Sequence, residues 1–71
     1  MDLKMRLRRR RVRLHLHDGN PSIEGIIIGT IDGHYLLKAA KLLKSTEETL
    51  SLDGDVEVPR RNVLLLQRIG H

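Results

Sequence analysis

The 71-residue chain contains no cysteine, tryptophan or phenylalanine, and Tyr35 is its only aromatic residue. Without cysteine it has neither a disulfide nor a thiolate metal site, which are common stabilisers of small domains. A domain of this size buries only about 60 % of its surface, so we expect it to need a partner or further copies of itself. No apolar run approaches the roughly 20 residues that span a bilayer, and the basic start lacks the apolar stretch of a signal peptide. These absences predict a soluble, uncleaved chain.

The residue patterns that catalysis or metal binding requires are also absent from the sequence. Its serines and threonines have no nucleophile context, and there is no glycine-rich loop of the phosphate-binding form. His15 and His17 have the spacing of a metal-binding pair, but no third ligand lies close in the sequence. Asp53, Asp55 and Glu57 lack the spacing of a calcium loop and predict an acidic strand edge that discourages aggregation. We therefore expect no enzyme, no metal site and no cofactor.

Positive charge is concentrated at the N-terminus. Residues 1–13 carry seven bases and one acid, a local charge of +6, whereas residues 14–71 carry six bases and eight acids. The second part is therefore −2, and the two parts add to the net charge of +4. Such a cluster is typical of a segment that contacts a polyanion. We expect nucleic-acid phosphates or an acidic protein surface to be contacted by Arg6, Arg8, Arg9, Arg10, Arg11 and Arg13.

Hydrophobic alternation separates this basic start from the rest of the chain. Apolar residues occupy odd positions up to Leu7 and even positions from Val12, so one flat strand cannot keep both sets on one face. We expect residues 1–10 to form a basic extended arm and residues 11–71 to form one domain, with its first strand over residues 11–17. The arm has no aromatic side chain, which predicts contact with phosphate backbone rather than stacking on bases.

A tight hairpin is predicted where Asp32 and Gly33 separate two apolar segments, residues 23–31 and 34–41. If these two residues form the loop, the predicted cross-strand pairs are Thr30–Tyr35, Ile28–Leu37, Ile26–Ala39 and Glu24–Lys41. This register places apolar side chains on one face and ends in an opposite-charge pair, so it is self-consistent.

The segment 50–58 has two interpretations. A two-residue hairpin loop at Asp53 and Gly54 would mix core and surface positions, so we exclude it. A single strand that bends sharply at Gly54 keeps the apolar residues on one face, and so does a three-residue loop over residues 53–55. Both of these interpretations stay open. A break at residues 59–62 precedes the last strand, residues 63–69, whose middle is apolar on both faces.

Five short strands, one tight hairpin and a bent fourth strand predict an all-β fold: a small, five-stranded, strongly bent antiparallel barrel of the SH3-like or Sm-like kind. Residues 14–19 (LHLHDG) and 23–29 (IEGIIIG) resemble the first Sm motif, in which a strand ends at an Asp-Gly turn and the next strand carries a glycine at its bend. Residues 54–58 (GDVEV) and 62–66 (NVLLL) are similar to the second Sm motif. The resemblance covers about residues 12–69 of the chain.

The resemblance to Sm proteins implies assembly. Members of that family form rings by pairing the fourth strand of one subunit with the fifth strand of the next, and many bind uridine-rich RNA. The expected interface residues here are Val56, Val58, Leu64, Leu65 and Leu66. The base-binding pattern is not carried over, because Pro59 and Arg60 stand where the second motif has arginine and glycine, and Asn62 alone matches well.

A looser resemblance, through LHLHDG, EG, GHY, VP and NV, is to short barrel proteins of unknown role encoded by phages of actinobacteria. It implies a virion or assembly component, located in the cytoplasm or in a phage particle assembled there. The main hypothesis is a non-enzymatic homo-oligomer or subunit of a larger assembly that joins through apolar strand edges and contacts nucleic-acid backbone or an acidic surface. The alternatives are an Sm-like RNA-binding ring and a module that binds a host protein through an open sheet edge.

Overall fold

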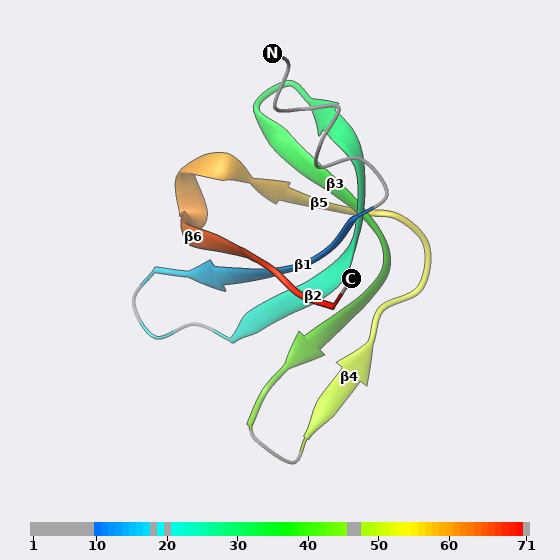
Figure 1. Ribbon diagram of the computed structural model, residues 1–71, viewed down its shortest axis with the longest axis vertical. Coiled ribbons are helices and arrows are strands. Elements are labelled where there is room, and N and C mark those ends of the chain that lie inside the picture. The colour runs from blue at the N-terminus through cyan, green and yellow to red at the C-terminus, as the bar shows by residue number, and fades with distance from the viewer. Residues whose placement is uncertain (1–9, 18, 20, 46–47, 71) are drawn as a thin grey trace.

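Alternating apolar residues and turn signals produce a single curved antiparallel sheet in the computed structural model, which describes residues 10–17, 19, 21–45 and 48–70 (Figure 1). Its elements are β1 (Arg10–Leu16), β2 (Ser22–Ile31), β3 (His34–Leu43), β4 (Thr49–Ser51), β5 (Val56–Pro59), the 3-10 turn η1 (Arg60–Asn62) and β6 (Val63–Arg68). The strand order is β4-β3-β2-β1-β6, and β5 also pairs with β3. The expected all-β fold, a small and strongly bent barrel, is confirmed.

The predicted hairpin connects β2 to β3. Asp32 and Gly33 have positive φ angles of 47° and 76°. Positive φ at both central residues is the geometry of a two-residue type I′ turn, whose twist matches that of the flanking strands. Two pairs of the predicted register are confirmed, namely Thr30 with Tyr35 and Glu24 with Lys41.

In the middle of the β2–β3 hairpin, the predicted cross-strand pairs are wrong by one residue. Ile27 pairs with Leu37 and Ile26 with Lys38, in place of the predicted Ile28–Leu37 and Ile26–Ala39 pairs. An extra residue on β2 shifts the ladder by one position, and an extra residue on β3 shifts it back. As a result Ile27 is buried and Ile28 is only half-buried. Because residues 26–28 are all isoleucine, hydrophobicity alone does not distinguish the two registers.

The extra residue on β3, a β-bulge, lies where the backbone of β3 packs closely against Gly25 of β2. A Cβ atom added at Gly25 would lie 3.2 Å from both the Ala40 Cα and the Lys38 carbonyl oxygen, closer than nearly all real contacts of this kind. The residue between these two, Ala39, has a φ of 53°, which an L-residue adopts only at a cost in backbone energy. Close packing at Gly25 and the unusual backbone at Ala39 together bend the sheet at this point.

Gly54 marks the bend in the fourth predicted strand. β4 pairs with residues 41–43 of β3, and β5 pairs with residues 34–37 of the same strand. Between them Gly54 has a φ of 72°, a backbone conformation that glycine adopts without strain. Because both segments pair with β3 rather than with each other, the bent-strand interpretation is confirmed and the three-residue hairpin loop is excluded.

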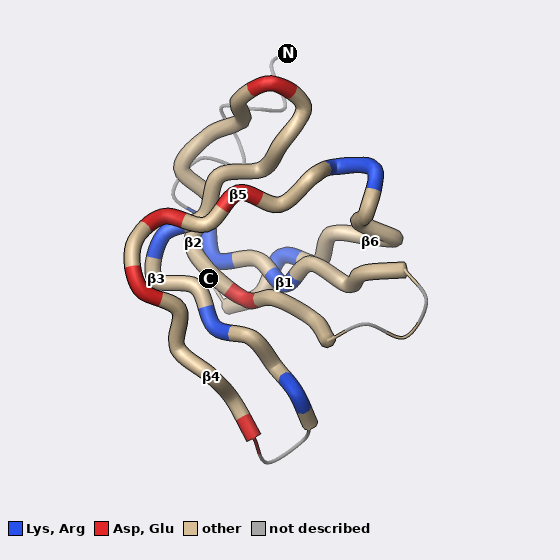
Figure 2. The backbone as a smooth tube through the Cα atoms, turned by 180° about the vertical axis from the view of Figure 1, so that it is seen from behind, with Lys and Arg blue, Asp and Glu red and all other residues tan. Residues whose placement is uncertain are grey.

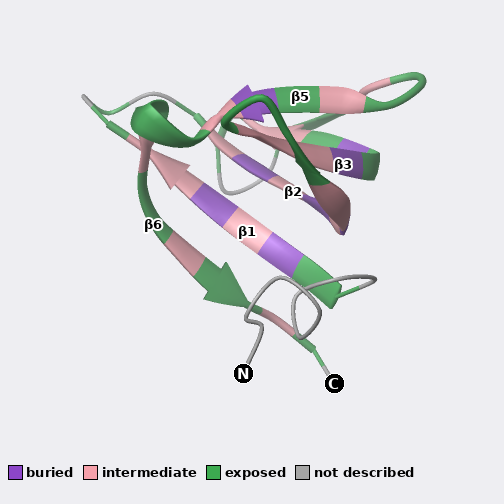
Figure 3. Ribbon diagram, turned by 90° about the horizontal axis from the view of Figure 1, so that it is seen from above, coloured by how far each residue is buried: buried purple, intermediate pink, exposed green. Residues whose placement is uncertain are grey.

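The core is small and contains no fully buried aromatic ring. Figure 3 shows the alternation of buried and half-buried positions along β1, as expected for a strand with one face toward the core. Tyr35, which the predicted register assigns to the core face, is half-buried and packs against the core. The buried hydrophobic residues are Val12, Leu14, Ile23, Ile27, Leu37, Ala40 and Val58.

Candidate functional site

The bent sheet has two free edges. One is the outer edge of β6, and the other is the outer edge of β4 and β5. In the described part of the chain β5 and β6 are connected through η1, and no ladder joins them. Each edge therefore presents backbone donors and acceptors that another strand can pair with.

Backbone hydrogen bonds define which groups of β6 face outward. The Ile69 N–H donates to the Arg11 carbonyl oxygen at 3.0 Å, so Ile69 faces β1. Because backbone groups alternate sides along a strand, Gln67 also faces β1, while the N–H and C=O groups of Leu66 and Arg68 face the free edge.

The same reasoning applies to β5. The Arg60 N–H donates to the Gly33 carbonyl oxygen at 3.0 Å, which places the backbone groups of Val58 toward β3 and those of Glu57 and Pro59 toward the free edge. Proline lacks an N–H, and an edge position of this kind is where a strand tolerates it. The β5 edge therefore offers the Glu57 N–H but no donor at Pro59.

The five predicted interface residues occupy different environments. Leu64 and Leu65 are 60 % and 50 % exposed, which is unusual for leucine and leaves apolar surface beside the β6 edge. Leu66 and Val56 are half-buried against the core. Val58 is buried, so its side chain belongs to the core of the protomer, and its backbone groups face β3 rather than the free edge.

The two free edges differ in charge. Residues 48–59, which include β4 and β5, carry four acids and no base, whereas residues 60–69, which include η1 and β6, carry three bases and no acid. Figure 2 shows the acidic positions along the β4–β5 part of the backbone. All seven side chains are exposed: Glu48, Asp53, Asp55 and Glu57 on one side, and Arg60, Arg61 and Arg68 on the other. The two edge segments are thus complementary in charge. The interface was predicted from apolar residues of these strands, without a comparison of their charges.

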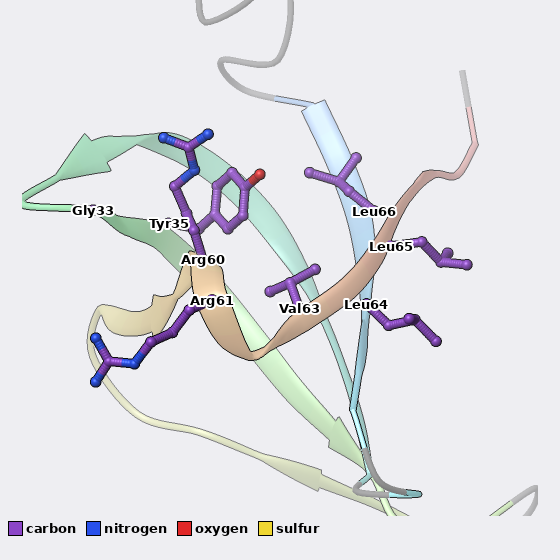
Figure 4. A pocket seen from close by; sticks show the side chains of 8 residues that line it. All are labelled: Gly33, Tyr35, Arg60, Arg61, Val63, Leu64, Leu65 and Leu66. Atoms are coloured by element: carbon purple, nitrogen blue, oxygen red, sulfur yellow. The ribbon is translucent and has the colours of Figure 1, made fainter.

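A hollow of about 500 Å³ lies beside the β6 edge (Figure 4). The guanidinium carbon of Arg60 is 5.8 Å from the centre of the Tyr35 ring, within the range of a cation–π contact. This contact holds η1 against β3 at one side of the hollow, and exposed leucines line the other side. The lining residues are Gly33, Tyr35, Arg60, Arg61, Val63, Leu64, Leu65 and Leu66.

The predicted basic residues are only partly within the described chain. Arg6, Arg8 and Arg9 lie outside the described residues, so the arm stays a prediction. β1 begins at Arg10, one residue earlier than expected, and both Arg10 and Arg11 are exposed. Arg13 differs from them because its Nη2 atom donates to Glu24 Oε2 at 3.1 Å in a half-buried ion pair. The charge of Arg13 is thus matched within the protein.

Other site types find little support in the described residues. His15 Nε2 lies 2.8 Å from Gln67 Oε1, a contact that connects β1 to β6. Among residues 10–17, 19, 21–45 and 48–70, no three His, Asp or Glu side chains are grouped so that they could hold a metal ion. No helix in this part of the chain is long and apolar enough to cross a membrane.

No protein-family model matches the sequence, and no curated protein matches it significantly. Solved structures do resemble the fold. A heptameric archaeal Sm protein, described for its implications for the eukaryotic snRNP core, is 20 % identical with a TM-score of 0.79, and the match covers 96 % of this chain and 97 % of that one. The SmAP1 heptamer of P. aerophilum is 20 % identical with a TM-score of 0.81, covering 97 % and 90 %. An Sm-like protein from Archaeoglobus fulgidus is 22 % identical with a TM-score of 0.76, covering 94 % and 89 %.

These similarities bear on the predicted fold. At 20–22 % identity over nearly the full length, they show that the arrangement of strands is shared. The three structures are archaeal or Sm-like by description, and none of them supports the looser resemblance to phage proteins.

Proposed function

From an Sm-like fold with two unlike free edges, we propose that this chain is a non-catalytic assembly module that forms a closed ring of identical copies and contacts the phosphates of nucleic acid. In this ring the β6 edge of one copy pairs with the β4–β5 edge of the next. The observation that carries the proposal is the opposite charge of the two edge segments, with four acids in residues 48–59 and three bases in residues 60–69, of which Arg68 lies in β6.

Unlike edges favour a ring over a simple dimer. A two-fold dimer pairs a surface with itself, which here would bring like charges together. Pairing of unlike edges is head-to-tail, and such a contact closes into a ring when the rotation between copies allows it. Two of the similar structures are described as heptamers, which supports closure for this sheet geometry. Burial of Leu64 and Leu65 by the neighbouring copy would add a hydrophobic contribution.

The nucleic-acid part rests on the basic N-terminal end. Arg10 and Arg11 are exposed and form no ion pair with another described residue, and they belong to the segment 1–13 with its charge of +6. In a ring, each copy would contribute one such segment, which multiplies the contacts to a phosphate backbone. This mode of contact predicts little dependence on base sequence.

Specific binding of single-stranded RNA is a second candidate. The hydrogen bond from Arg60 N–H to the Gly33 carbonyl places η1 beside the β2–β3 turn. This contact brings Asp32, in the β2–β3 turn, and Asn62, which matches the second Sm motif, onto neighbouring segments. An RNA-binding ring would use these segments rather than the basic N-terminal end.

The assembly proposal is tested first by the mass of the particle in solution. The protein is stripped of nucleic acid at high salt, returned to about 0.1 M salt, and measured by light scattering with refractive-index detection, because one tyrosine absorbs weakly. We expect a single species of several subunits that loosens as salt rises, since salt screens the complementary edges. A monomer at every concentration and salt would contradict ring formation and favour docking on another protein.

The two nucleic-acid candidates differ in the variants that affect them. Replacing residues 8–11 by glutamine is expected to reduce affinity for mixed-sequence DNA and RNA alike, and to flatten the dependence of affinity on salt. Asp32→Ala and Asn62→Ala serve as matched variants and should leave this binding unchanged. Fluorescence anisotropy with mixed and oligo-uridine strands measures the difference. A uridine preference that is lost in Asn62→Ala but kept in the arginine variant would favour the second candidate.

A further inference from the structure

A second hollow, of about 220 Å³, lies on the outer face of the sheet and is separate from the hollow beside β6. It is formed by β1, β2 and β3, where the bulge leaves Ala39 without a cross-strand partner. Gly25 and Ala39 are the smallest residues at this position, so no long side chain from them fills the space. The lining residues are Arg11, Glu24, Gly25, Ile26, Ala39 and Lys41.

Cationic side chains surround this hollow. Arg11, from β1, and Lys41, from β3, both line it and are exposed. Glu24 is the one acid of the lining, and its carboxylate is already paired with Arg13 at 3.1 Å. Lys38, opposite Ile26, adds a further exposed base next to it. Because Arg13 balances the charge of Glu24, the positive charges of Arg11 and Lys41 remain at the rim of the hollow.

The size and composition of the hollow restrict what it can bind. Pockets for drug-sized ligands run from about 300 to 1,000 Å³, so this space suits a small group. No aromatic residue lines it, which excludes a stacking platform for a base. A compact anion with several oxygen acceptors fits a guanidinium and an ammonium on opposite sides.

The position of the hollow connects it to the basic N-terminal end. Arg11 belongs both to the exposed start of β1 and to the lining. The hollow is also centred on β2, away from the free edges of β6 and β4–β5, so pairing of those edges would leave it open. We propose that this hollow binds a phosphate group and, resting on the proposed function, that the phosphate is that of a nucleic-acid strand whose path continues from the N-terminal arm onto β3.

The test compares Lys41→Gln with Lys44→Gln in the full chain. Both lysines are exposed, but Lys44 follows the end of β3 and does not line the hollow. One phosphate contact on a single strand contributes a salt exponent of about 0.7, so at about 0.1 M salt Lys41→Gln should weaken binding of a 20-nucleotide mixed-sequence DNA strand about fivefold. Glu24→Gln, which removes the acid from the lining, should tighten it. Equal effects of Lys41→Gln and Lys44→Gln would overturn the site.

A second measurement distinguishes the source of the phosphate. Backbone amide shifts of Gly25, Ala39 and Lys41 are followed by NMR during titration with the same DNA strand and with inorganic phosphate, against chloride at equal ionic strength. Shifts with DNA that are lost in Lys41→Gln support the nucleic-acid source, and shifts with inorganic phosphate alone support a free-phosphate site. No shift with either probe overturns the inference. If DNA binds and the amides of Gly25, Ala39 and Lys41 do not shift, the proposed function stands without this site. If DNA does not bind at all, the nucleic-acid part of the proposed function fails independently.

Discussion

The Leu64→Glu, Leu65→Glu double variant is expected to be monomeric at concentrations where the wild type is assembled. Both side chains are at least half exposed in the protomer, so the fold should tolerate the change. Burying the exposed parts of two leucines contributes about 2 kcal/mol per interface, and the new carboxylates would face the acidic β4–β5 edge. We expect the dissociation constant of each contact to rise about 100-fold or more, measured by light scattering over a dilution series.

The matched control is Leu64→Lys, Leu65→Lys, which is equally polar but opposite in charge. It removes the same apolar surface while adding attraction to the acidic edge, so it should assemble more readily than the glutamate variant. If both variants are monomeric to the same extent, apolar burial alone holds the interface. If both assemble like the wild type, the β6 edge is not the interface and the ring proposal is wrong.

Leu14→Ala is expected to remove a large part of the folding free energy. Leu14 is fully buried and pairs with Ile23 on one side and Leu66 on the other. Truncation of a buried leucine costs about 2–5 kcal/mol, whereas a domain of this length has about 4–10 kcal/mol in total. Urea unfolding followed by far-UV circular dichroism measures the loss.

The control for the core variant is Leu50→Ala. Leu50 is 49 % exposed on β4, so its truncation should cost less than about 1 kcal/mol. Both changes are best made in the Leu64→Glu, Leu65→Glu background, because assembly itself stabilises the folded chain. Equal losses at Leu14 and Leu50 would contradict the core described above.

Local signals predicted most of the architecture. The turn at Asp32 and Gly33 was predicted because a type I′ turn needs positive φ at both residues. The bend at Gly54 was one of two interpretations left open, and the pairing of β4 and β5 with β3 decided between them. The register near Ile27 could not be found in this way, since three consecutive isoleucines satisfy either face. The bulge depends on the contact between Gly25 and Ala40, which lie on different strands, and a single sequence does not reveal such contacts.

The candidate sites were predictable to different degrees. The basic start was evident from the charge of residues 1–13 alone. The complementary edges could have been noticed by comparing residues 48–59 with residues 60–69, but their meaning required knowing that these segments form the two ends of one sheet. The pairing of Lys41 with Glu24 was predicted, but the hollow that Lys41 shares with Arg11 was not, because the sequence did not reveal the bulge at Ala39.

Pairing between β1 and β6 has a consequence for how the protein is made. In the described part of the chain these are the first and last strands, and the register joins Val12 to Arg68, so all the other elements, β2 to η1, separate the two partners. β6 therefore docks only after its residues have left the ribosome, and such distant contacts form late in folding. The edge that β6 offers to a neighbouring copy does not exist on a growing chain. A contact between copies that uses the β6 edge can therefore form only after residues 63–68 have been made and have docked on β1.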